Sequence, residues 1–247
     1  MKKHPRIKRI LLILLAVIIA AIAGFLIYAS DYYLADATAT AYLKSDTTLQ
    51  TQGSQIVLTP DTPSDTALIF YPGAKVEATA YLPILEKIKD QCGINVILVK
   101  MPFNMAIFNV NAADGVMASH PDITNWYIGG HSMGGAMASS YAAGHKDKVK
   151  GLILLGAYIY GDYPAGRALT IYGSLNADLE KHMDYTENIV KIPGGNHAQF
   201  GNYGAQRGDA EQWEQSWAQP LPGPAGDDAG AEDGAAHDDG EQTAEQD

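Results

Sequence analysis

Cysteine is almost absent from this chain of 247 residues, which contains Cys92 and no other. A single cysteine excludes an internal disulfide and any zinc site built from several thiolates. Cys92 follows a helical pattern just before Gly93, so we expect a small buried apolar residue there. One cysteine also suits an oxidising compartment outside the cytoplasm.

Basic residues are scarce as well, with 17 Lys and Arg against 28 Asp and Glu, and the formal net charge is −11. Five of the basic residues lie within residues 1–9, whereas residues 219–247 contain nine acidic residues and no Lys or Arg. A nucleic-acid-binding protein concentrates Lys and Arg on its folded part. Nucleic acid is therefore not an expected partner.

Residues 10–29 form a long apolar run without a charge, enough to cross a bilayer as a helix. Basic residues precede the run and acidic ones follow it, which predicts a cytoplasmic N-terminus and an extracellular domain. A cleaved signal peptide is the alternative. Against it, the run is longer than a usual signal core and Tyr28-Ala29-Ser30 is a poor cleavage site. We therefore expect a single-pass anchor in the cell membrane.

The chain divides into segments of different composition. The C-terminal tail (219–247) is rich in Pro, Gly, Ala, Asp and Glu and has almost no apolar side chains to bury, so it is predicted to be disordered. Residues 35–43 fit two alternatives, a juxtamembrane stalk or a short helix that leads into the domain. The expected segments are a cytoplasmic basic segment (1–9), a transmembrane helix (10–29), a juxtamembrane stalk (30–52), an α/β domain (53–218) and the acidic tail (219–247).

Between residues 53 and 218, apolar strands alternate with helical patterns. This alternation is typical of βαβ units and predicts an α/β fold with a mostly parallel sheet flanked by helices. The predicted strands are 55–58, 66–71, 94–99, 124–128, 149–155, 168–172 and 189–192; the predicted helices are 78–91, 112–120, 133–145 and a last one over 208–218.

The motif Gly130-x-Ser132-x-Gly134 falls between a predicted strand and a predicted helix. The pattern alone is common, but a sharp strand-to-helix turn pushes its serine out above the carboxyl ends of the strands. The helix N-terminus then lies beneath the hydroxyl, where backbone amides can stabilise an oxyanion. Ser132 is therefore the candidate nucleophile.

A serine hydroxyl needs a base to attack at neutral pH. Of the seven histidines, His197 alone follows a predicted strand in a loop at the carboxyl edge of the sheet. His131 lies inside the turn and should point away from the serine hydroxyl. His197 is therefore the candidate base.

These motifs resemble the α/β-hydrolase fold family, in its branch of small exported or membrane-anchored bacterial serine hydrolases. The resemblance runs from about residue 30 to about 208 and includes Phe70–Lys75, Lys100–Asn104, the serine turn and Gly194–Gly201. It implies an acyl-enzyme mechanism with no metal or organic cofactor. It also implies that the backbone N–H groups of Met133 and Ala74 form the oxyanion hole.

The acid of the family's triad is not evident. Relatives usually carry an Asp where this chain has Asn176, and the next carboxylate is Asp178. Asp178 is the candidate acid, Asp184 or another carboxylate is the second alternative, and a site without any acid is the third. Without an acid the histidine loses control of its tautomer, and turnover falls while binding can survive.

The segment 156–167 is too short for a lid, so we expect an open site rimmed by Tyr158, Tyr160 and Tyr163. Lys75 could bind an anionic substrate or be an ordinary solvated lysine. The expected function is a membrane-anchored, carboxylesterase-like hydrolase of a small or surface-presented ester, thioester or amide. An acyltransferase that uses the same residues and a catalytically inactive binding or scaffold protein are the alternatives.

Overall fold

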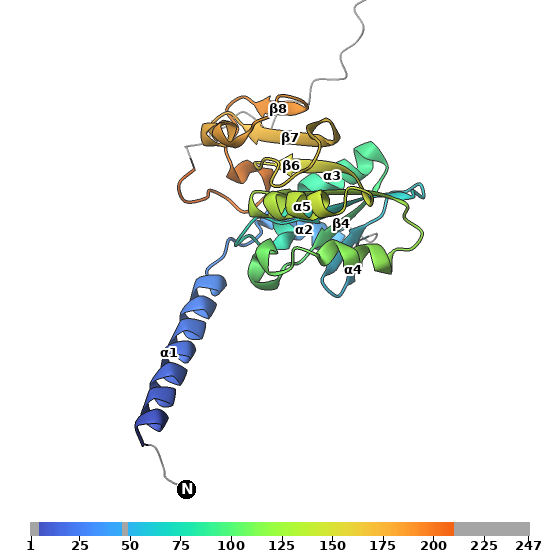
Figure 1. Cartoon of the computed structure of the whole chain (residues 1–247). Helices are drawn as coiled ribbons and strands as arrows, with labels where there is room; N and C mark the ends of the chain where they lie inside the picture. Colours follow the sequence, from blue (N-terminus) through green and yellow to red (C-terminus); the bar gives the residue numbers. More distant parts are fainter. Residues whose placement is uncertain (1–4, 46–48, 210–247) are drawn as a thin grey trace, which may run out of the picture. The chain divides into compact units, whose positions relative to one another are not determined.

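The computed structural model describes residues 5–45 and 49–209. The acidic tail and all but the start of the predicted 208–218 helix lie outside that part. The apolar run forms one helix, α1 (Pro5–Ser30) (Figure 1). Its described side chains are exposed almost throughout. By length and composition α1 could cross a membrane, although a signal sequence would pass the same test.

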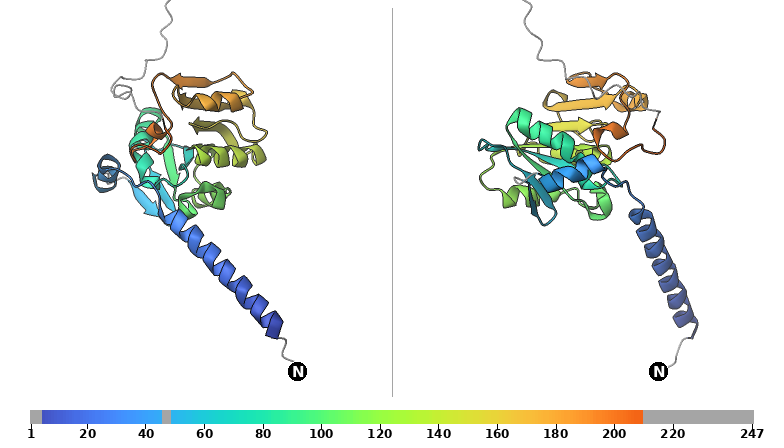
Figure 2. Two further views of the ribbon diagram at one scale, coloured as in Figure 1. Left: turned by 90° about the vertical axis from the view of Figure 1, so that its left-hand side faces the viewer. Right: turned by 180° about the vertical axis from the view of Figure 1, so that it is seen from behind.

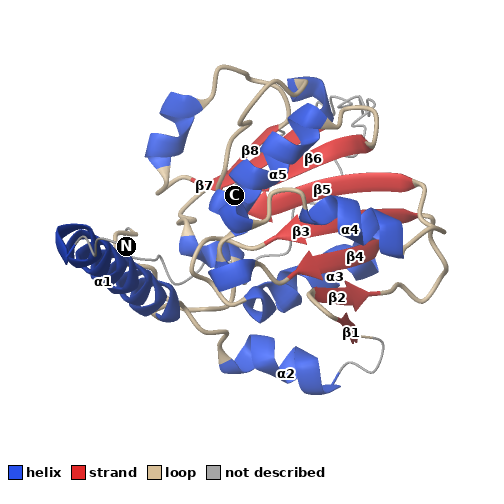
Figure 3. Cartoon of the chain, turned by 60° about the horizontal axis from the view of Figure 1, so that its bottom comes forward, coloured by secondary structure: helices blue, strands red, loops and turns tan. Residues whose placement is uncertain are grey.

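Eight strands form a single sheet in the order β1-β2-β4-β3-β5-β6-β7-β8 (Figure 3). The six strands from β4 to β8 in this order are parallel, while β2 is antiparallel to both β4 and β1. The fold class expected from the sequence is confirmed. The strands are β1 (Gln50–Gln52), β2 (Gln55–Leu58), β3 (Thr66–Tyr71), β4 (Asn95–Val99), β5 (Asn125–His131), β6 (Val149–Leu155), β7 (Ala168–Gly173) and β8 (Ile189–Ile192).

Helices cover both faces of the sheet. Successive residues of a strand point to opposite faces. Accordingly, Leu68 and Phe70 of β3 pack with α3 (Leu82–Cys92), whereas Ile69 and Tyr71 pack with α4 (Ala112–Ser119) and α5 (Met133–Gly144). Figure 2 shows α2 (Ala37–Ser45) and α3 in front of the sheet when the chain is seen from behind. Short 3₁₀ turns fill several connections: Ala78–Tyr81, Pro102–Asn104, Ala106–Phe108, Ala165–Arg167, Ala177–His182 and Ala198–Phe200.

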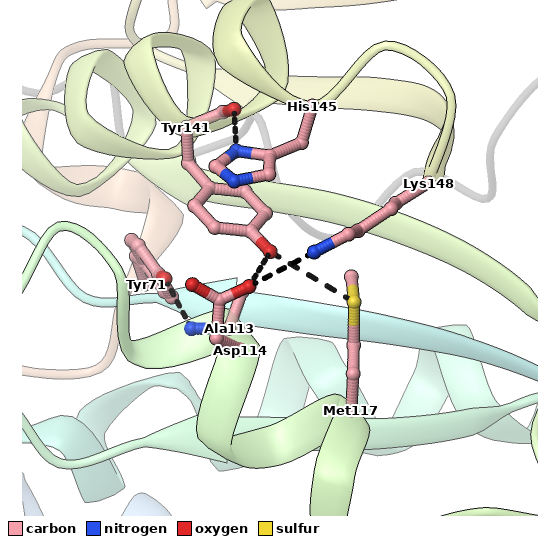
Figure 4. A network of polar contacts seen from close by, with 7 residues as sticks. All are labelled: Tyr71, Ala113, Asp114, Met117, Tyr141, His145 and Lys148. Atoms are coloured by element: carbon pink, nitrogen blue, oxygen red, sulfur yellow. Dashed lines mark hydrogen bonds and ion pairs between the residues drawn. The ribbon is translucent and has the colours of Figure 1, made fainter.

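A network of polar contacts joins α4 to α5 (Figure 4). The Tyr141 hydroxyl donates to Asp114 Oδ1 at 2.8 Å, and Lys148 Nζ lies 3.4 Å from the same oxygen. The His145 ring stacks on Tyr141, with ring centroids 4.1 Å apart. Because Tyr141 donates to it, the pKa of Asp114 lies below its usual value.

The segment after α1 is fixed to the domain. Tyr33 donates its backbone N–H to the carbonyl of Lys75 at 2.7 Å, and its own carbonyl accepts from Glu77. Ala39 of α2 is fully buried. Of the two alternatives for this region, residues 37–45 form the helix.

One expectation about the core is wrong. Cys92 is exposed. It is the last residue of α3, and Gly93 ends that helix with a left-handed φ of 62°. The terminal position therefore faces solvent although it follows the helical pattern.

Candidate active site

Ser132 sits at a strained turn between β5 and α5. Its φ is 53° and its ψ is −124°, a backbone conformation that non-glycine residues rarely adopt. The turn requires glycine on both sides of the serine. A Cβ at Gly130 would lie 2.5 Å from the carbonyl oxygen of Tyr71, and one at Gly134 would lie 2.1 Å from it. The strain and the close approach of β3 are those of a sharp strand-to-helix turn with the serine at its apex.

His197 follows β8, in a loop held by hydrogen bonds to the end of β7. Gly194 donates to the Ser174 hydroxyl at 2.8 Å, and Leu175 donates to the carbonyl of Gly195 at 2.9 Å. Both loops leave the carboxyl edge of the sheet, where β5 also ends. His197 and Ser132 therefore line the same cavity.

The side chain in contact with His197 Nδ1 belongs to Asn176, whose Nδ2 lies 3.0 Å away. The predicted acid, Asp178, borders the same cavities as His197, but its Oδ1 pairs with Lys181 at 2.5 Å and its side chain is 84% exposed. Asp184 is exposed as well. The structure thus brings Ser132 and His197 together but holds the imidazole with an amide instead of a carboxylate.

The orientation of this amide decides what His197 can do. If Asn176 presents its oxygen, Nδ1 carries the proton and Nε2 is free to accept the proton of a serine. If it presents its NH₂ group, Nδ1 accepts, Nε2 carries the proton, and the base is blocked. A carboxylate accepts only, and it would enforce the first arrangement.

Asp209 is a carboxylate near His197 that the sequence analysis missed. Its Oδ2 accepts the backbone N–H of Ala198 at 2.7 Å. It lines a cavity of about 240 Å³ that also borders His197 and Asn176. Burial lowers the pKa of His197, and the negative charge of Asp209 opposes that shift. No sequence motif marks Asp209, because only the fold brings it back to the histidine loop.

The two backbone amides that the resemblance assigns to an oxyanion hole belong to Met133 and Ala74. Met133 is the first residue of α5, and Ala74 follows the end of β3. Within the described residues, neither backbone N–H has a hydrogen-bond acceptor. Both amides are therefore available to an oxyanion, and the start of α5 adds the positive end of its helix dipole.

A buried chain of hydrogen bonds joins the loop of Ala74 to the loop of His197. Gly73 donates to the Tyr81 hydroxyl at 3.0 Å, and this hydroxyl lies 2.8 Å from His131 Nδ1. His131 Nε2 lies 2.9 Å from the carbonyl of His197, which only accepts. Nε2 must therefore carry the proton, and Tyr81 donates to Nδ1. Burial lowers the pKa of His131 to about 3, so that the ring stays neutral.

The cavity above Ser132 is open and has a volume of about 310 Å³. Tyr158 and His182 border it with stacked rings, their centroids 5.1 Å apart. Of the expected tyrosine rim, Tyr160 is exposed, but Tyr163 is buried and donates to the carbonyl of Val149 at the start of β6. Tyr163 therefore belongs to the core. Over residues 5–45 and 49–209 no cluster of side chains suits a metal ion.

The chain matches the Alpha/beta hydrolase family over residues 67–219, more than half of its length. No curated protein matches it in sequence.

Several solved structures are similar. MenH from S. aureus is 20% identical, with a TM-score of 0.36, over 42% of each chain, so this chain spans less than half the length of that protein. The substrate-bound fluorophosphonate-binding serine hydrolase F of Staphylococcus aureus is 15% identical over 62% of this chain and 90% of its own, with a TM-score of 0.42. A bacterial heroin esterase is 15% identical over 66% and 81%, with a TM-score of 0.47.

Proposed function

Since this chain belongs to the alpha/beta hydrolase family, we propose that it is a serine hydrolase, anchored in the cell membrane, that cleaves an ester, thioester or amide through an acyl-enzyme. The observation that supports this most is the strained Ser132, which borders one cavity together with His197. The N–H of Met133, at the start of α5, has no acceptor among the described residues and borders the same cavity.

In the proposed reaction, Ser132 attacks the acyl carbon while His197 Nε2 accepts the serine proton. The N–H groups of Met133 and Ala74 stabilise the oxyanion, and His197 returns the proton to the leaving group. Water then attacks the acyl-enzyme, with the same histidine as base. In this reaction the Asn176 amide is turned by about 180° from the placement with Nδ2 on the imidazole. Its oxygen then orients the ring, in the role first assigned to Asp178. Asp209 supplies the nearby negative charge that favours the imidazolium.

Labelling of the full chain in detergent with a fluorophosphonate probe tests this reaction. We expect covalent labelling that is lost in Ser132→Ala and strongly reduced in His197→Ala. Ser140→Ala, on the same helix, is the matched control and should label like the wild type. A folded protein that does not label would overturn the proposal.

The proposed location can be tested with the native cysteine. Cys92 is exposed on the domain, so a membrane-impermeant maleimide should label it in intact cells if the domain is extracellular. Labelling only after lysis would place the domain in the cytoplasm. Release of the full domain by alkaline carbonate would favour a cleaved signal peptide over an anchor.

The contact between Asn176 and His197 favours a second candidate, a binding protein that retains the fold without turnover. In that case the amide donates to Nδ1 and the serine has no base. Such a protein would bind an acyl ligand but would not label, and Ser132→Ala would leave its affinity unchanged.

A further inference from the structure

The connection between β4 and α4 exposes large apolar side chains. Residues 101–111, which we call the apolar loop, contain no charged residue. Within it Phe103 is 46% exposed, Ile107 54% and Phe108 49%. Phe103 and Asn104 both have positive φ values, 54° and 53°. The loop therefore exposes its apolar side chains in spite of a strained backbone. A contiguous exposed group of this kind marks an interaction surface.

The apolar loop lies where the chain enters the domain from α1. The backbone N–H of Lys75 donates to the carbonyl of Asn104 at 2.8 Å. The carbonyl of Lys75 in turn accepts the backbone N–H of Tyr33 at 2.7 Å. Only two residues separate Ser30, the end of α1, from Tyr33. Because an extended residue spans at most about 3.5 Å, the loop lies within roughly 10 to 15 Å of the end of α1.

Side chains of α1 contact the apolar loop directly. The ring of Phe25 meets those of Phe103 and Phe108 edge to face, with centroids 5.1 Å and 5.6 Å apart. Phe25 precedes the end of α1 by five residues, or about 7.5 Å along the helix axis. With α1 across a bilayer, the two loop phenylalanines therefore reach the boundary between acyl chains and headgroups. Lys75 lies over the Tyr28 ring at 4.1 Å, an arrangement suited to that boundary.

We propose that the apolar loop docks on the outer leaflet of the same membrane, with Phe103, Ile107 and Phe108 inserted among the lipids. This inference rests on the proposed function, in which α1 is an anchor. The loop follows the carboxyl end of β4, the edge of the sheet that also carries Ser132. The docked domain therefore presents its catalytic edge to the membrane, and its acyl substrates are those held at the lipid surface.

Depth-dependent fluorescence quenching tests the docking in the full chain. The native cysteine is replaced with Cys92→Ser, and single cysteines are introduced with Ile107→Cys, Val190→Cys and Ile18→Cys for labelling with bimane. Val190 is the matched control, because it is 46% exposed on β8 and distant in sequence from the loop. Each protein is placed singly in nanodiscs of phosphatidylcholine and phosphatidylglycerol, so that a second copy cannot cover the loop. The acyl chains carry nitroxide quenchers at both upper and lower positions, because residue 18 lies near the bilayer centre.

We expect the label at residue 107 to be quenched to at least half the extent of the label at residue 18, and the label at 190 to be unaffected. Quenching at 18 but not at 107 would overturn the docking and leave the anchor standing. No quenching at 18 would overturn the anchor together with the docking. Since labelling of Ser132 is not measured, neither result depends on catalysis.

Discussion

Two polar networks in this domain each hold a histidine, and they differ in where the carboxylate is. In the network of Figure 4, Asp114 accepts from Tyr141 and pairs with Lys148, beside the stacked His145. In the candidate site, an amide contacts His197, and the carboxylate of Asp209 accepts a backbone N–H of the same loop. The first network connects α4 to α5 and stabilises their packing. The second has the parts of a reaction centre without its usual charge.

A carboxylate, Asp114, is present in the network that packs α4 against α5. On Nδ1 of His197, where relatives of this family usually have a carboxylate, this chain has an amide. An acceptor-only group fixes the tautomer of a neighbouring histidine, whereas an amide can turn over and release it. The geometry of the site therefore does not fix how strong a base His197 is. Substitutions in the two networks can measure that base strength.

The largest effect is expected from Asn176→Asp, which places a carboxylate on Nδ1. The rate of fluorophosphonate labelling should rise, toward the roughly 10⁴-fold that separates Asp from Asn in an established triad. The added charge should also raise the pKa of His197, which burial now lowers. Because the base acts when neutral, the acid limb of the rate profile should move to higher pH.

Asp178→Asn is the matched control for that substitution. It removes the carboxylate first predicted from the sequence, whose partner is Lys181, and should leave the labelling rate unchanged. A large loss in this variant would show that Asp178 is the acid and that the contact with Asn176 is incidental.

A smaller effect concerns His131, which links the two loops and stays neutral because burial lowers its pKa to about 3. The unfolded chain binds a proton near pH 6.5 and the folded one does not. This contribution to stability is therefore full above pH 6.5 and is lost as the pH falls toward 3. Between pH 7 and 4 the free energy of unfolding should drop by about 3 kcal/mol from this residue.

Urea denaturation at several pH values measures that loss. His131→Gln keeps a donor for the carbonyl of His197 and an acceptor for Tyr81, but it does not titrate. Its free energy of unfolding should fall less steeply with acid than that of the wild type. Equal slopes would mean that His131 is protonated in the folded state.

The smallest effect is expected from Asp114→Asn. At neutral pH it should cost about 1 kcal/mol of stability, a low value because the carboxylate is half-exposed. The pKa of Asp114 is lowered, so its contribution is present above the usual carboxyl value and is lost as the pH falls through the lowered one. The two proteins should therefore melt alike in strong acid. The labelling rate should not change, and a changed rate would show that the two networks are coupled.

The sequence predicted the elements whose signals are local. Apolar runs identified every strand but β1, and the glycines around Ser132 identified the turn because a Cβ there would strike β3. It failed for β1, whose three residues are polar and exposed. It also placed Tyr163 at the rim, since periodicity cannot tell a buried loop residue from an exposed one.

The partners of His197 could not be predicted in the same way. Whether residue 176 or 178 reaches the imidazole depends on the hydrogen bonds of Ser174 and Leu175 to the histidine loop. Asp209 lies twelve residues after His197, and the chain must fold back for its carboxylate to reach that loop. These are tertiary contacts between segments whose sequences carry no mark of the pairing.

The two residues between α1 and Tyr33 have a consequence for how substrates are met. With α1 in the bilayer, the domain stays at the lipid surface and keeps one face toward it, because a two-residue connection is too short to let it move away or rotate. Encounters then occur by lateral diffusion, and their frequency depends on the number of acyl groups per unit area of membrane. The rate of such a hydrolase would follow the surface density of its substrate, even when the bulk concentration is held constant.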